Sequence, residues 1–193
     1  MSFVRGQSWA RPIKLHAWFA AAFAMSSFAI FGAAGLLGAA TKTAIPVKAQ
    51  AILSLGVLSC ALILDLYGLK QKSWCVLSLR RQTPKRILRD FGARRAALAW
   101  GLDAGLVFTT FRMSSLSWAL LALAILGVAP SWVGLGYAAG FLLPFLLASV
   151  LSGTWSAAEA PALAERLARS PSVARATCVA ALLCSVVMGL LLV

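Results

Sequence analysis

The chain has 193 residues, of which 61% are hydrophobic and only 12% are charged, whereas a soluble domain is about half apolar and about a quarter charged. The net charge of +13 would suit nucleic-acid binding, but half of the 18 Lys and Arg residues lie between residues 70 and 95, where the positive-inside rule explains them. At roughly 20 residues per membrane span, the length fits one all-α polytopic membrane domain over residues 1–193, with no second soluble domain.

The first apolar run covers residues 15–40 and follows a short basic tail. Because the apolar core of a signal peptide is only about 7–15 residues long, we expect a retained transmembrane span. Ala34 and Gly38 have the small-xxx-small spacing that lets another helix approach closely. The basic tail predicts a cytoplasmic N-terminus, in a multi-pass protein of the plasma (inner) membrane.

The second predicted span, residues 50–69, follows a connector over residues 41–49. It returns the chain to the cytoplasmic side, which agrees with the basic segment that comes next. Asp65 lies about one turn from the cytoplasmic end of this span. There we expect its carboxylate to reach lipid headgroups or Lys70, and a buried role is the alternative.

Residues 70–95 are predicted to form a basic cytoplasmic loop that contains a short helix. Thr83 followed by Pro84 is typical of a helix start, and Gly92 of a helix end. The apolar side chains between them share one face, so the helix is suited to lie on anionic lipid at about 1 kcal/mol per basic residue near the surface. A cytoplasmic docking partner is the alternative. The basic residues expected at the membrane surface are Lys85, Arg86 and Arg89.

Residues 96–130 are too long for one straight span, because about 35 residues extend about 50 Å and the hydrocarbon core is about 30 Å thick. We expect a break within the polar segment 109–117, where hydroxyl groups can satisfy freed backbone groups. A tight helical hairpin here gives about six transmembrane helices in total, the preferred count, with both termini cytoplasmic. A single broken helix gives five, with the C-terminus outside.

Two charged residues, Asp103 and Arg112, lie inside this stretch. An ionised side chain at mid-bilayer costs about 2.5–3.5 kcal/mol on insertion scales, so each needs a partner or a wet cavity. One hypothesis is a gated polar pathway. The other is that Arg112 marks an extracytoplasmic turn while Asp103 forms a packing hydrogen bond. The candidates for the polar site are Asp103, Thr109, Thr110, Arg112, Ser114 and Ser115.

Two pairs of glycines have GxxxG spacing, which favours close helix packing. Gly101 and Gly105 flank Asp103, and Gly136 and Gly140 lie in the next predicted span, residues 131–152. We expect both pairs to face neighbouring helices.

The C-terminal part is predicted to contain a polar connector over residues 153–172, followed by a last span over residues 173–193. Within the connector, residues 160–168 are expected to form a short separate helix at the membrane interface.

A short internal similarity links residues 23–28 with residues 111–116, because both hexads carry Met-Ser-Ser at the same places. Many transporters build midplane sites from inverted repeats with broken helices at corresponding positions. The similarity slightly favours a transporter, although chance similarity between apolar helices explains it as well.

Neither a metal site nor a cofactor site is predicted. The four cysteines, Cys60, Cys75, Cys178 and Cys184, have no CxxC spacing, and there is one histidine. A redox pair between Cys60 and a late cysteine would need the second and last spans to be adjacent. The sequence also lacks a nucleophile-base arrangement, a phosphate-binding glycine loop and a carboxylate pair at catalytic spacing, so an enzyme is not favoured.

The segment 100–110, Trp-Gly-Leu-Asp-Ala-Gly-Leu-Val-Phe-Thr-Thr, followed by a polar centre, resembles a core helix of the CcdA/DsbD-type membrane thiol-disulfide transporters. The resemblance implies a small six-span protein, built from two three-helix repeats, that passes reducing equivalents across the membrane. That family places a cysteine beside a proline at the break, whereas this chain has Thr109, Thr110, Phe111 and Arg112 there. The resemblance therefore implies the architecture without the active-site cysteines.

Two classes of function follow. The first is a transporter-like inner-membrane protein with a polar pathway from Asp103 to Arg112. The alternative is a non-catalytic subunit or assembly factor that binds another membrane protein through its GxxxG faces. The expected partners are the lipid bilayer, anionic lipid at the basic loop and, in the second class, another membrane protein, with no nucleic acid.

Overall fold

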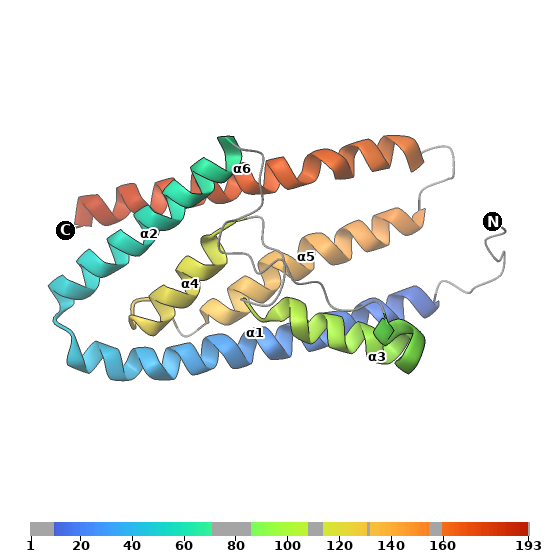
Figure 1. Cartoon of the computed structure of the whole chain (residues 1–193), viewed down its shortest axis with the longest axis horizontal. Coiled ribbons are helices and arrows are strands. Elements are labelled where there is room, and N and C mark those ends of the chain that lie inside the picture. The colour runs from blue at the N-terminus through green and yellow to red at the C-terminus, as the bar shows by residue number, and fades with distance from the viewer. Residues whose placement is uncertain (1–9, 71–85, 108–113, 131, 155–159, 193) are drawn as a thin grey trace.

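The computed structural model describes residues 10–70, 86–107, 114–130, 132–154 and 160–192. Within these ranges the chain forms six α-helices and no β-strand, which confirms the all-α prediction. The helices are α1 (Ala10–Ala44), α2 (Val47–Lys70), α3 (Arg86–Gly105), α4 (Leu116–Ile125), α5 (Val133–Thr154) and α6 (Ala160–Leu192) (Figure 1).

Two helical segments of the described chain are long and apolar enough to cross a membrane: Lys14–Ala44 within α1, and the whole of α2. Buried core helices and N-terminal signal sequences can satisfy the same criteria of length and composition. Shorter apolar stretches lie in α4, α5 and α6. Two helices of the described chain are therefore candidates for membrane spans.

Helix α1 is the scaffold of the fold, because α3, α4 and α5 all pack against it. Gly101 of α3 lies against Phe19 in the first half of α1, and Gly127, just after α4, lies against Gly38 in the second half. Helices α3 and α4 therefore follow α1 one after the other in the same direction (Figure 1). Helices α3 and α4 are therefore two consecutive segments along α1 rather than the two arms of an antiparallel hairpin.

The remaining helices run antiparallel to their neighbours. The rings of Phe141 in α5 and Phe23 in α1 have centroids 4.4 Å apart, while Gly134, at the start of α5, lies against Phe31. In α6, the Arg175 Nη1 donates a hydrogen bond of 3.0 Å to the Gly68 carbonyl near the end of α2.

The chain thus passes along the bundle five times, counting α3 and α4 as one pass, and the described ends of α1 and α6 lie at opposite ends of it (Figure 1). Because α4 continues in the direction of α3 instead of reversing it, the described helices resemble the alternative of one broken helix more than a hairpin, and the number of membrane crossings stays a prediction.

Two helix boundaries differ from the expected ones, and a third, at Gly92, agrees. Only residues 45 and 46 separate α1 from α2, instead of a connector over residues 41–49. Residues 160–168 are not a separate helix but the first part of α6, which begins with Pro161 in its first turn, where proline costs no hydrogen bond. Gly92, the expected helix stop, has φ 79° and ψ 168° and separates two helical segments within α3.

The core contains few large side chains. Its main buried cluster combines residues from α1 and α4 with one residue just after α3 and the first residue of α5. These residues are Phe31, Ala34, Val107, Leu121, Ala124 and Val133. A second cluster joins α2, α4 and α6 through Ala61, Ala119 and Leu182. Because α4 contributes to both clusters, it connects the α1 side of the bundle to the α2–α6 side.

Candidate polar site at the helix break

Asp65 on α2 is one of the most deeply buried polar residues of the described chain, because only 2% of its surface is exposed. Its carboxylate Oδ1 accepts a hydrogen bond of 2.7 Å from the backbone N–H of Ser115, and its Oδ2 accepts one from the Ser114 hydroxyl. The expectation that this carboxylate reaches lipid headgroups or Lys70 is therefore wrong. The buried role is the correct one, because the broken helix brings two donors to Asp65.

These donors belong to the N-terminal end of α4, where backbone N–H groups have no partner within the helix. Ser115 is the N-cap residue, but its own side chain makes no capping hydrogen bond. The Ser114 Oγ accepts a bond of 3.0 Å from the Leu116 N–H, and Asp65 accepts the bond from Ser115. A carboxylate at a helix N-terminus also interacts favourably with the helix dipole. Asp65 thus caps α4 from a neighbouring helix.

The other end of the break is capped from α1. The Ser27 hydroxyl donates a hydrogen bond of 3.3 Å to the carbonyl of Gly105, the last residue of α3. Ser27 is fully buried, and its neighbour Ser26 donates back to the Phe23 carbonyl of its own helix at 3.1 Å. Both ends freed by the break therefore obtain hydrogen bonds from other helices, as an irregular backbone inside an apolar bundle requires.

The two Ser-Ser pairs of the hexad similarity both lie at this break. Ser26 and Ser27 come from α1, and Ser114 and Ser115 precede α4, and all four are less than a tenth exposed. The structure thus places the two serine pairs at the two ends of the same discontinuity, one on each side. Both pairs donate hydrogen bonds across the break: the Ser27 hydroxyl donates to a carbonyl, and the Ser115 backbone N–H donates to a carboxylate.

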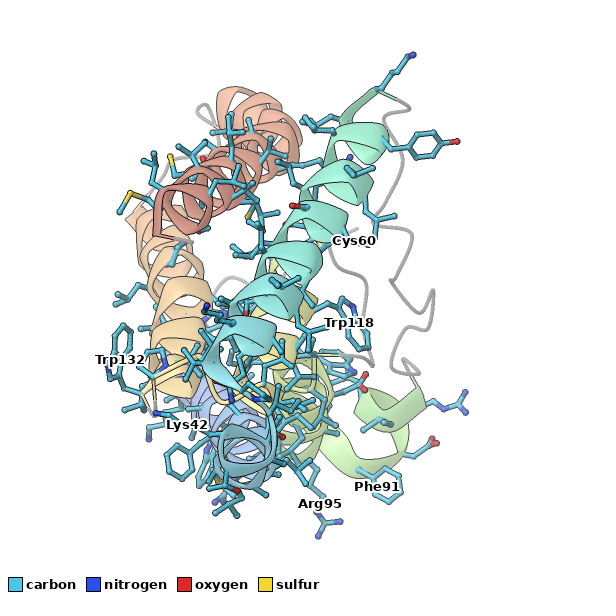
Figure 2. All side chains as sticks on the ribbon, turned by 90° about the vertical axis from the view of Figure 1, so that its left-hand side faces the viewer. Lys42, Cys60, Phe91, Arg95, Trp118 and Trp132 are labelled. Carbon is cyan, nitrogen blue, oxygen red and sulfur yellow. The ribbon has the colours of Figure 1, made fainter. Side chains whose placement is uncertain are left out.

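A cysteine completes the set of reactive side chains. Cys178 on α6 is half-buried beside the Ser114 hydroxyl and within electrostatic reach of the Asp65 carboxylate. Helices α2 and α6 are adjacent, the condition stated for a redox pair, but Cys60 and Cys184 are exposed (Cys60 is labelled in Figure 2), and the three described cysteines are free thiols. Among the described residues, no group of three His, Cys, Asp or Glu side chains is placed to bind a metal ion.

The other candidates for the polar site are only partly described. Ser114 and Ser115 belong to the site around Asp65. Asp103 is half-buried on α3, and Thr109, Thr110 and Arg112 lie outside the described residues. The polar site within the described residues therefore consists of Ser114 and Ser115, from the predicted set, and Asp65 on α2.

The first GxxxG pair packs as expected. A side chain at Gly101 would overlap the Phe19 carbonyl oxygen, and one at Gly105 would overlap the Ser26 hydroxyl. Helix α3 therefore approaches α1 closely along this face, which brings Gly105 within reach of Ser27.

The second GxxxG pair lies on a different face from the one that packs. An added Cβ at Gly140 would meet nothing within 4 Å, and one at Gly136 would contact only the ring of Trp132, four residues earlier. Gly134, by contrast, lies 2.9 Å from the Phe31 Cβ when a Cβ is added, and Ala138 is 5% exposed. The packing face of α5 is thus offset by two residues from the predicted one.

The basic segment is described from residue 86 onwards, and Lys85 lies outside the described residues. Arg86 begins α3, and Arg89 forms an exposed ion pair of 3.1 Å with Asp90. Leu88 and Phe91 are 47% and 57% exposed, and Figure 2 shows Phe91 pointing away from the bundle. The first segment of α3 therefore presents both charge and apolar area at the surface.

A cation-π contact holds the second segment of α3 against α1. The Arg94 guanidinium carbon lies 4.0 Å from the centroid of the Trp18 ring. Arg95, its neighbour, points outward (Figure 2). This contact fixes α3 just after the Gly92 bend.

Comparison with known protein families, with curated proteins and with solved structures found no match. The functional argument therefore rests on the geometry of the polar site and on the surface of the bundle.

Proposed function

We propose that this chain is a polytopic membrane protein that crosses the bilayer five times, with α3 and α4 forming one discontinuous span. Support comes from the bundle surface, where large apolar side chains are widely exposed on several helices. Leu36, Val47 and Leu191 are 78%, 79% and 76% exposed. Soluble monomers rarely expose such extended apolar surface, whereas a lipid environment favours it.

The proposed orientation places the start of α1 and the bend of α3 in the cytoplasm. The start of α1, which follows the basic tail in sequence, and the first segment of α3, which carries Arg86 and Arg89, lie at the same end of the bundle, in agreement with the positive-inside rule (Figure 1). The C-terminal end of α6 is then extracytoplasmic. The location that fits this pattern is the plasma (inner) membrane.

For function, we propose a transporter-like protein whose polar site is the break between α3 and α4, with Asp65 as its proton-binding group. The observation that carries the proposal is the buried Asp65 carboxylate at the N-terminus of α4. Ionisable residues inside a membrane are rare, and they commonly mark ion or proton pathways. Discontinuous helices with a free N-terminus are a common way to build such sites.

The hydrogen bonds suit both protonation states of Asp65. With the carboxylate ionised, Ser114 and Ser115 both donate to it. When one oxygen binds a proton, that oxygen can donate to the Ser114 Oγ, while Ser115 continues to donate to Oδ1. Asp65 therefore keeps both neighbours as hydrogen-bond partners in either state, while the Ser114 hydroxyl hydrogen needs another acceptor when Asp65 carries the proton.

The Asp103 to Arg112 pathway becomes an extension of this proposal. Asp103 lies on α3 just before the break, and Arg112 lies in the segment that precedes Ser114, so both positions flank the site along the chain. The resemblance to membrane thiol-disulfide transporters supports a transport function only at the level of architecture. Cys178 beside Ser114 is the cysteine to test for a redox role at this site.

Infrared difference spectroscopy between acid and alkaline pH tests the proton-binding role. The purified protein should show a band from a protonated carboxylic acid that disappears in the Asp65→Asn variant. The Asp103→Asn variant is the matched control, and it should keep the band if Asp65 is the proton-binding group. A spectrum that is the same in the wild type and in Asp65→Asn would refute the assignment.

Single-cysteine labelling at positions 103–117, in a background without the native cysteines, tests the pathway. Positions that line a wet pathway should react with a water-soluble maleimide in a regular pattern, and reaction at Arg112→Cys should be faster than at Leu121→Cys in the apolar core. Uniform protection across the range would contradict a polar pathway.

The first segment of α3 is proposed to lie on the anionic inner leaflet through Leu88 and Phe91, with Arg86 and Arg89, together with Lys85, facing the headgroups. In vesicles, Phe91→Cys should be protected from a water-soluble reagent and Asp90→Cys should be labelled. Equal labelling of both positions would leave a cytoplasmic docking partner as the better explanation.

The second candidate function is a non-catalytic subunit or assembly factor. The face of α5 that carries Gly136 and Gly140 favours it, because this GxxxG face contacts no other described helix. Purification in a mild detergent should then recover a stoichiometric membrane partner. Gly140→Leu should release that partner, whereas Ala139→Leu on the adjacent face should retain it.

A further inference from the structure

A groove of about 380 Å³ lies between the second half of α1 and the turn from α4 to α5. Its floor is made by the glycine-rich part of α1, and an added Cβ at Gly32 or Gly35 would meet nothing within 4 Å. Its other wall comes from the turn between α4 and α5, at Gly127 and Pro130. The volume lies at the lower end of the roughly 300–1,000 Å³ found for ligand pockets.

The groove is apolar along its length and has a cation at one end. Lys42 is its one charged lining residue, and Gly127 packs against the base of this side chain, since an added Cβ there would lie 3.1 Å from the Lys42 Cβ. Figure 2 shows Lys42 and the exposed Trp132 on the same side of the bundle. An occupant must therefore combine an apolar body with a negative end.

Among the residues that the structure describes, no acidic side chain pairs with Lys42. The first acidic residue in the sequence is Asp65, and the segment between α4 and α5 contains none. Lys42 forms no ion pair with the described residues. A second copy of the chain would bring the same excess of positive charge from Lys42 and Lys48, so charge complementarity points to an external anion.

We infer that this groove binds the acyl chain of a phospholipid with a net negative headgroup, whose phosphate is held by Lys42. The inference rests on the membrane placement proposed above. Under that placement Lys42 lies at the extracytoplasmic end of α1, so the lipid comes from the outer leaflet. The bare glycine surface admits the chain closely, and the exposed Trp132 lies on the same side of the bundle as Lys42 (Figure 2).

Photo-cross-linking tests the inference. A photoreactive phenylalanine analogue is placed at Leu36, which lines the groove, or at Leu37, which is also exposed but is not part of the groove. The protein is reconstituted in vesicles of equal phosphatidylglycerol and phosphatidylcholine, and the adducts are weighed. At Leu36 we expect phosphatidylglycerol to be enriched about fivefold over its share at Leu37, the factor that about 1 kcal/mol per basic side chain gives.

Three further variants define the site. Lys42→Gln should remove the enrichment at Leu36, whereas Lys48→Gln, a lysine at the same end that does not line the groove, should keep it. Gly35→Leu should fill the groove and remove the lipid adduct at Leu36.

The outcomes separate this inference from the membrane proposal. Lipid adducts of the same composition at Leu36 and Leu37, or an adduct at Leu36 with a second copy of the chain, would overturn the groove inference alone. The absence of any lipid adduct at both positions would overturn the membrane placement as well.

Discussion

Replacing Asp65 tests whether the break between α3 and α4 depends on a cap from α2. In Asp65→Ala, the Ser115 N–H and the Ser114 hydroxyl lose their buried acceptor. An unsatisfied buried donor costs about 1–3 kcal/mol, so the two together predict a loss of about 2–6 kcal/mol in the free energy of unfolding. In Asp65→Asn, the amide oxygen still accepts from Ser115 and the amide nitrogen donates to the Ser114 Oγ. The charge is lost and the Ser114 hydroxyl hydrogen loses its acceptor, so the expected cost is about 1–3 kcal/mol, from one unsatisfied donor instead of two.

Equilibrium unfolding in mild detergent with increasing dodecyl sulfate, followed by tryptophan fluorescence, measures both variants. Ser54→Ala is the matched control, since Ser54 is also buried on α2 but its hydroxyl has no hydrogen-bond partner among the described residues. Its stability should be unchanged or slightly higher. The reasoning fails if Asp65→Ala stays within about 0.5 kcal/mol of the wild type. It also fails if Asp65→Asn loses as much stability as Asp65→Ala.

The same unfolding assay checks three other expectations. Gly105→Ala should lower the free energy of unfolding by about 1–3 kcal/mol, because its new methyl group overlaps α1. Gly140→Ala, whose methyl group meets open space, should raise it by up to about 1 kcal/mol. Equal effects of the two variants would contradict the assigned packing faces. Arg94→Ala should lose about 0.5–1 kcal/mol with its cation-π contact, and Arg95→Ala should lose less, so a larger loss for Arg95 would be contrary evidence. Gly92→Ala should lower the free energy of unfolding by about 1–3 kcal/mol, because the backbone at this position has φ 79° and ψ 168°, a conformation that strains any residue with a Cβ, even though the site itself is open. An unchanged stability would show that the bend is not needed.

Much of the helix content was predictable from local pattern. The apolar runs of α1 and α2 were expected at residues 15–40 and 50–69, and the helices extend these ranges by only a few residues. The break within residues 96–130 was also predictable, because its length exceeds what one straight span can use. Gly92 was expected to end a helix because glycine adopts a positive φ without a steric cost, and it has one.

The polar site was predictable in part. Ser114 and Ser115 were recognised because hydroxyl groups near a break can satisfy freed backbone groups. Asp65 was assigned to the surface because its position near the end of a span offered a simpler partner. One signal was available in the sequence: Gln50, Ser54, Ala61 and Asp65 fall on one face of α2, and all four are buried in the structure. A polar residue at helical spacing from other small or polar residues points to the packed face.

The sequence by itself determined that this protein is helical, that it is unusually apolar, and that residues 96–130 must break. These properties depend on composition, on periodicity and on the length of a helix per residue, all of which are local. Only the tertiary structure decided that α4 continues in the direction of α3, that Asp65 caps it, and that α5 packs on Gly134 rather than on Gly136 and Gly140. These choices depend on which faces of different helices meet, and residues about 50 positions apart in sequence, such as Asp65 and Ser115, carry no local signal of their contact.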